Sequence, residues 1–153
     1  MLGRRELSEA QVRQRLARRG HDDAAIDAAV TRLKSDRSID DMRVAGAIAR
    51  SETSLRKRGK LRVKRCIEAA GIAAATAQQA VDETFQDIDG DALIAAALEK
   101  RLRGRTCIEG DREFQRLYRY LASQGFESDQ IVSVLKNRLT TKHTKRSKRT
   151  KFL

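Results

Sequence analysis

The sequence predicts an all-α protein built from tandem helical repeats. Proline and tryptophan are absent and aromatic residues make up 4% of the chain, while alanine, arginine and leucine dominate, a composition that favours helices. An apolar pattern with offsets of four, four, six and four residues also recurs without insertion. Its three copies are Val12, Leu16, Gly20, Ile26 and Val30, then Val63, Ile67, Gly71, Ala77 and Val81, and finally Leu117, Leu121, Gly125, Ile131 and Leu135.

Each copy of the pattern predicts two helices joined at its glycine. Apolar residues four positions apart share one face of a helix, and Ile26, Val30 and Leu33 continue such a face after the first glycine. Glycine readily takes the left-handed conformation that ends many helices. An apolar residue follows the second and third glycines, whereas His21 takes this place in the first copy.

Capping residues predict where the helices begin, and they reveal a third helix in the unit. Asp40 precedes an apolar face that contains Val44, Ala45 and Ile48, so we expect a helix from there to about Arg50. The unit is therefore three helices. Side chains suited to N-capping also stand at Ser8, with Gln11 completing a capping box, and at Asp111 and Ser128.

The second and third repeats differ in how they end. An acidic turn around Asp89 and Gly90 precedes a helix from about Ala92 to Leu102. The turn lacks the glutamate that completes a calcium-binding loop, which favours a capped helix start over a metal site. No third helix is predicted after the last copy. We divide the chain into a lead-in at 1–7, repeats at 8–51, 52–110 and 111–139, and a tail at 140–153.

Positive charge is the strongest indication of a partner. The net charge is +12 and the pI is about 10.4, so the chain should bind a polyanion such as nucleic acid, an acidic protein or an anionic membrane. We predict a disordered tail that binds phosphates without reading sequence. Its candidate residues are Lys142, Lys145, Arg146, Lys148 and Arg149. The candidate partner-binding residues of the repeats are Arg15, Arg18, Arg56, Lys57, Arg58, Arg62 and Lys64.

Several classes of function are disfavoured. The sequence has no nucleophile elbow, no phosphate-binding glycine loop and no metal-ligand spacing, so we expect no catalytic residue, metal or cofactor. Cys66 and Cys107 do not form a CxxC pair, and Cys66 is expected to be a small, at least half-buried side chain. With no bilayer-spanning run, signal peptide or heptad seam, we expect a cytoplasmic monomer that does not bind membranes.

Three motifs resemble the RecX family of regulatory proteins, which act on the bacterial recombinase RecA. Departures from the family pattern are Val44, where phenylalanine is usual, and His21, where an apolar or aromatic residue is usual. The motifs are Ser8, Gln11, Val12, Arg13, Arg15, Leu16, Arg18, Arg19 and Gly20, then Ile39, Asp40, Asp41, Arg43, Val44, Ala45, Arg50 and Ser51, and lastly Phe114, Arg116, Leu117, Arg119, Tyr120, Leu121, Gln124, Gly125 and Phe126.

The resemblance implies both a shape and a function. It implies three tandem three-helix modules in an elongated, curved arrangement. It also implies binding to the RecA filament on single-stranded DNA, with inhibition of recombinase, ATPase and co-protease activity in DNA repair, recombination and the SOS response. The alternative is a general basic protein that binds single- or double-stranded DNA. Tyr118 completes an apolar helix face and is expected in the core, whereas Tyr120 is left open between packing and base stacking.

Overall fold

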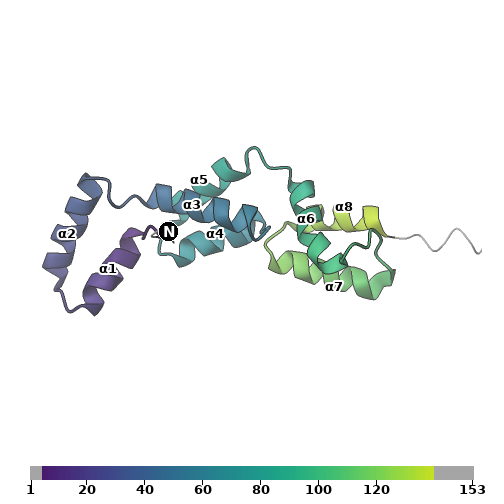
Figure 1. Cartoon of the computed structure of the whole chain (residues 1–153), viewed down its shortest axis with the longest axis horizontal. Helices are drawn as coiled ribbons and strands as arrows, with labels where there is room; N and C mark the ends of the chain where they lie inside the picture. Colours follow the sequence, from purple (N-terminus) through teal and green to yellow (C-terminus); the bar gives the residue numbers. More distant parts are fainter. Residues whose placement is uncertain (1–4, 140–153) are drawn as a thin grey trace, which may run out of the picture.

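The computed structural model describes residues 5–139 and folds this part of the chain into an elongated row of α-helices (Figure 1). No strand forms in that range, although an isolated parallel β-bridge joins Ile108 to Leu139. The expected all-α repeat architecture is confirmed. The helices are α1 (Glu9–Arg18), α2 (Asp23–Ser35), α3 (Asp41–Ser54), α4 (Lys60–Ala69), α5 (Ala74–Phe85), α6 (Gly90–Leu102), α7 (Gly110–Ser123) and α8 (Ser128–Arg138). The predicted basic tail lies outside the described residues.

Three helix starts are capped as predicted. Ser8 and Gln11 form a reciprocal capping box at α1. The Asp40 carboxylate accepts the Arg43 N–H at 3.1 Å at the start of α3. Asp89 caps α6 by accepting from the N–H groups of the two residues that follow Gly90. The acidic turn is thus a helix start.

Two predicted caps are wrong, because both helices begin earlier than expected. The N-cap of α7 is Glu109, and Asp111 already lies in the first turn. The Glu113 carboxylate accepts the Glu109 N–H at 2.8 Å, so the N-cap N–H is held two residues ahead of the predicted cap. Ser128 is the first residue of α8, and its hydroxyl accepts from the Tyr118 hydroxyl at 2.9 Å.

The three repeat glycines end their helices in the predicted left-handed conformation. Their φ angles are +87° at Gly20, +81° at Gly71 and +90° at Gly125. The apolar residues after the second and third glycines, Ile72 and Phe126, are buried. His21 is exposed. The first turn therefore lacks the apolar anchor of the other two.

Packing groups the helices differently from the sequence repeat. Helices α3, α4 and α5 pack against one another, as do α6, α7 and α8, while α1 pairs with α2. The third helix of each of the first two repeats thus joins the pair of helices that follows it. One continuous core extends from Val44 in α3 to Leu135 in α8. Helix α1 contributes no buried residue, and Val12 and Leu16 stay half-buried because no third helix covers this pair.

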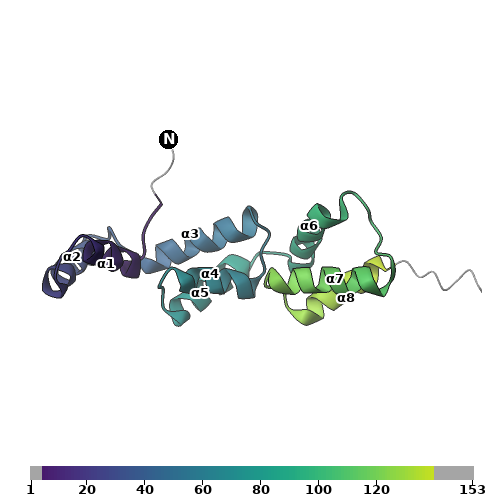
Figure 2. The same ribbon diagram turned by 90° about the horizontal axis from the view of Figure 1, so that it is seen from below.

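The start of α4 joins the two three-helix groups by docking onto the turn between α7 and α8. The Gly59 N–H donates to the Gln124 carbonyl at 2.9 Å, and the Leu61 N–H donates to the Gly125 carbonyl at 3.1 Å. The Arg62 guanidinium also donates to the Ser123 carbonyl at 2.8 Å. Carbonyls left over at the end of one helix therefore satisfy N–H groups left over at the start of another. Both views show these segments side by side (Figures 1 and 2).

The same junction occurs one repeat earlier. Ser8 holds the position in the first repeat that Gly59 holds in the second. Its hydroxyl donates to the carbonyl of Ala70, the residue before Gly71. A Cβ atom on Gly71 would lie 2.4 Å from the Ala10 Cβ, so the contact is close-packed. The start of each of the first two repeats therefore docks onto the glycine turn of the next repeat.

We predict that Gly125→Ala lowers the free energy of unfolding far more than Gly104→Ala does. Both residues are left-handed, with φ of +90° and +85°. This conformation costs alanine about 1–2 kcal/mol. A Cβ on Gly125 would also lie 2.2 Å from the Arg62 nitrogen, whereas one on Gly104 meets nothing within 4 Å. Overpacking adds about 1–3 kcal/mol to the loss at Gly125.

Urea unfolding followed by circular dichroism measures both changes in the free energy of unfolding. Gly104 is the matched control because it lies in the same three-helix group. Equal losses for Gly125→Ala and Gly104→Ala would show that the junction does not depend on close backbone approach.

Candidate partner-binding site

The predicted cations of the first repeat lie on the exposed surface of α1. Arg15 and Arg18 are three residues apart and form no ion pair with any residue that the structure describes. Arg13 on the same helix is instead engaged, at 2.6 Å from Asp27 and 3.2 Å from Glu9. These two carboxylates, Asp27 foremost, raise the pKa of Arg13. Arg15 and Arg18 are thus the α1 cations available to a partner.

The predicted cations between the first two repeats lie where α3 turns into α4. The Arg56 side chain is 60% exposed and lies 3.7 Å from Glu52. Lys57 is half-buried in a left-handed conformation, with φ of +53°, and Lys64 is half-buried on α4. Neither lysine forms an ion pair within residues 5–139. Arg65, which was not among the predicted site residues, is exposed on the same helix.

Two of the predicted site residues are engaged within the chain. Arg58 is ion-paired with Glu52, its side chain is 16% exposed, and its Nη1 lies 3.5 Å from the Cys66 Sγ. Arg62 holds the Ser123 carbonyl at the junction. Their primary contacts are structural, because they close the α3–α4 turn and fix α4 to α7. Cys66 is half-buried, as predicted.

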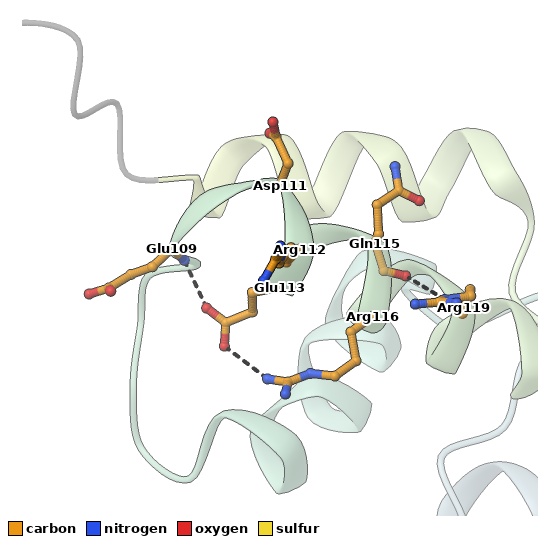
Figure 3. Close-up of a pocket in the computed structure, with 7 residues that line it drawn as sticks. All are labelled: Glu109, Asp111, Arg112, Glu113, Gln115, Arg116 and Arg119. Atoms are coloured by element: carbon orange, nitrogen blue, oxygen red, sulfur yellow. Dashed lines mark hydrogen bonds and ion pairs between the residues drawn. The ribbon is translucent and has the colours of Figure 1, made fainter.

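An arginine stripe on α7 was missed by the sequence analysis. Arg112, Arg116 and Arg119 are exposed and share one face of the helix at spacings of four and three residues. Figure 3 shows them around an open depression that Glu109, Asp111, Glu113 and Gln115 also line. The periodic spacing was the signal that could have revealed this stripe.

The depression is held in shape by Glu113, whose side chain is 11% exposed. It pairs with Arg105 and, at 3.5 Å, with Arg116, and it accepts the Glu109 N–H at 2.8 Å. The Arg105 hydrogen bond, followed by that from Glu109, lowers the pKa of Glu113 below its ordinary value of 4.5. This carboxylate therefore fixes the α6–α7 loop and orients one arginine of the stripe.

The two tyrosines of α7 pack against the core. Tyr118 is half-buried there, which confirms its prediction, and its hydroxyl is bound to Ser128. Tyr120 is also half-buried against the core, and the Arg101 guanidinium lies 4.2 Å from its ring centroid. This is a cation–π distance. One face of the Tyr120 ring is therefore already covered.

Residues 5–139 contain neither a group of candidate metal ligands nor a membrane-spanning helix. This part of the chain contains no group of three or more side chains suited to holding a metal ion. None of its helices is long and apolar enough to cross a membrane.

Comparison with known proteins identifies relatives along most of the chain. A model of the first three-helix domain of RecX matches residues 1–33, and a model of the third matches residues 88–135. The regulatory protein RecX of Halorhodospira halophila is 30% identical over 132 residues, which cover 86% of this chain and 79% of that protein. This chain belongs to the RecX family. The third RecX domain matches the region that forms the packed group α6, α7 and α8.

Other RecX proteins extend the comparison. The regulatory protein RecX of Chlorobium phaeobacteroides is 31% identical over 137 residues, covering 88% of this chain and 86% of that protein. The crystal structure of RecX from Lactobacillus salivarius superposes with a TM-score of 0.71 at 18% identity, over 86% of this chain and 84% of that one. The resemblance inferred from the three motifs is confirmed, and the RecX fold is shown.

We predict that Glu113→Gln lowers the stability of this RecX family member more at neutral pH than in acid. Because the folded-state pKa of Glu113 is depressed, its ionised form stabilises the fold above the ordinary value of 4.5. That contribution disappears as the pH falls through the lower folded-state pKa. Urea unfolding of both proteins at about pH 7 and about pH 3 measures the difference.

Asp111→Asn is the matched control, since it removes a carboxylate from the same turn without removing an ion pair. Its effect should be smaller than that of Glu113→Gln at neutral pH. A loss for Glu113→Gln that is the same at both pH values would contradict the assigned role of the ionised carboxylate.

Proposed function

We propose that this RecX family member binds the RecA filament on single-stranded DNA and inhibits its recombinase, ATPase and co-protease activities. The observation that carries the proposal is membership of a family of regulatory proteins. Under this proposal the protein acts without catalysis, in the cytoplasm, as a monomer. DNA repair, recombination and the SOS response are the processes it would modulate.

The shape of the molecule supports this proposal. A nucleoprotein filament is long and repetitive, and it presents DNA phosphates and acidic protein side chains along its length. The row of helices presents cations at intervals, with Arg15 and Arg18 on α1, Arg56 and Lys57 near the middle, and the arginine stripe on α7. The two junctions hold these cations at set positions, which lowers the entropy lost on binding. We infer that the modules bridge neighbouring filament subunits.

The second candidate function is general DNA binding, and the arginine stripe on α7 is the observation that favours it. Its three guanidiniums lie on one exposed face, a spacing suited to phosphate contacts. The tail residues, outside the described range, would add salt-dependent affinity. Under this candidate, the protein alters recombination by covering DNA.

We predict that the chain inhibits ATP hydrolysis by RecA on single-stranded DNA at well below one copy per RecA subunit. The experiment titrates the chain into preformed filaments and repeats the titration with excess competitor DNA. Inhibition that persists supports the filament as target, because competitor DNA removes any chain that merely binds DNA. Inhibition that requires near-stoichiometric protein and vanishes with competitor would favour the DNA-binding candidate.

We also predict that Arg56→Glu with Lys57→Glu weakens this inhibition about tenfold or more, because one exposed and one half-buried cation become anions facing an acidic target. Arg58 is left intact, since its side chain is only 16% exposed and its ion pair with Glu52 closes the α3–α4 turn, whereas the Arg56 side chain is 60% exposed and lies farther from Glu52, at 3.7 Å. The matched control is Arg32→Glu with Lys100→Glu, which makes the same charge change at exposed positions outside the predicted site.

Circular dichroism should show unchanged helicity in both double variants. Equal inhibition by the two variants would mean that net charge, and not the α3–α4 turn, sets the affinity for the filament.

A further inference from the structure

Two exposed leucines lie at the turn between α3 and α4, among exposed cations. Leu55 is 72% exposed and Leu61 is 46% exposed, and they are the exposed large apolar residues of residues 5–139. Single exposed apolar residues are ordinary on protein surfaces. Here both stand within seven positions of each other, across one turn. We call these leucines together with Arg56, Lys57, Lys60 and Arg65 the corner patch.

We infer that the corner patch docks onto protein, specifically an acidic surface that contains an apolar pocket, and that the two leucines are its anchors. This inference rests on the proposed function, in which the protein component of the filament supplies that surface. The inference assigns the contact at this turn to the protein component of the filament. Positive charge alone supports DNA and protein equally as the partner.

The backbone of the corner patch is fixed, so its leucines are presented in a set geometry. The Leu55 N–H donates to the Ser51 carbonyl at 3.1 Å, and the Lys57 N–H donates to the Thr53 carbonyl at 3.2 Å. The Leu61 N–H is held by the Gly125 carbonyl at the junction. The junction uses the backbone of Leu61 and leaves its side chain exposed. A preorganised apolar anchor loses little entropy on binding.

The charge around the leucines selects the chemistry of the partner. Arg56 is 60% exposed, and Lys60 and Arg65 are also exposed. Glu52, the acidic residue of this turn, is already paired with Arg58 and Arg56. The exposed charge of the patch is therefore positive, and a complementary surface is acidic.

The leucines favour protein over DNA as the acidic partner. A phosphate backbone gives cations their contacts but offers leucine no apolar pocket, and unstacked bases are bound mainly by aromatic rings. The two tyrosines, whose rings could stack on bases, are Tyr118 and Tyr120, and both pack against the core in the other three-helix group. Buried apolar anchors surrounded by a polar rim are instead the usual arrangement of protein interfaces.

The test uses the full chain with Leu55→Ser and Leu61→Ser, and a matched control with Leu55→Met and Leu61→Met. One readout is inhibition of RecA ATP hydrolysis with excess competitor DNA present. The other is binding of each variant to fluorescent single-stranded DNA alone. We expect the serine variant to need at least about tenfold more protein for half-inhibition. Its DNA affinity should be unchanged, and the methionine variant should inhibit like the unaltered chain.

Two results would overturn the inference while leaving the proposed function in place. In one, the serine variant inhibits as well as the unaltered chain. In the other, it loses DNA affinity in proportion to inhibition, which would assign the patch to DNA. Absence of competitor-resistant inhibition by the unaltered chain is a different result, because it refutes the proposed function itself. Exposed substitutions change stability little, and circular dichroism checks that helicity is retained.

Discussion

Helix α4 begins with N–H groups that no side chain caps, and carbonyls at the end of α7 satisfy them. The partial positive charge of one helix start thereby meets the partial negative charge of another helix end. The contact requires two backbones to touch, which only glycine permits at positions 59 and 125. The two three-helix groups also share one continuous core, and the junction fixes the backbone of α4 against the turn between α7 and α8. The spacing of surfaces on the two groups therefore depends in part on this backbone contact.

The junction also explains why the packing groups are offset from the sequence repeat. Each of the first two repeats uses the start of its first helix to reach the glycine turn of the next one, so that helix lies at a boundary. Helix α3 then packs with α4 and α5, and its Val44, Ala45 and Ala49 are the first residues along the chain to join the continuous core. Helices α1 and α2 pack against each other and contribute no residue to the continuous core. The predicted repeat boundaries describe how the sequence recurs, and the packed groups describe where apolar surface is buried.

Much of the fold could be predicted because it depends on local patterns. The spacing around Gly71 and Gly125 predicted helices, turns and buried residues, and Asp40 predicted a helix start. The caps at Asp111 and Ser128 were wrong because Glu113 accepts the N–H of Glu109, four residues earlier, and Tyr118 binds Ser128, ten residues later, and neither contact is part of the N-capping pattern. The inter-repeat junction was not predicted, since its donors and acceptors are backbone atoms more than sixty residues apart. Arg62 could not be separated from the exposed cations for the same reason, since its partner Ser123 is 61 residues away, whereas the Glu52 partner of Arg58 is only six residues away and was overlooked.

The cations of the α3–α4 turn fall into two groups, those that hold the fold together and those that a partner could contact. Arg58 closes the turn through Glu52, and Arg62 fixes α4 to the end of α7, so both maintain the shape that a partner meets. Lys57 and Arg65 form no ion pair among the described residues, Arg56 is 60% exposed beside Glu52, and Leu55 and Leu61 are exposed at the same turn. Folding does not require leucine at these two positions, since substitutions at exposed positions change stability little. The turn's rigid backbone, uncovered leucines and surplus positive charge are together the properties of a surface that another protein covers.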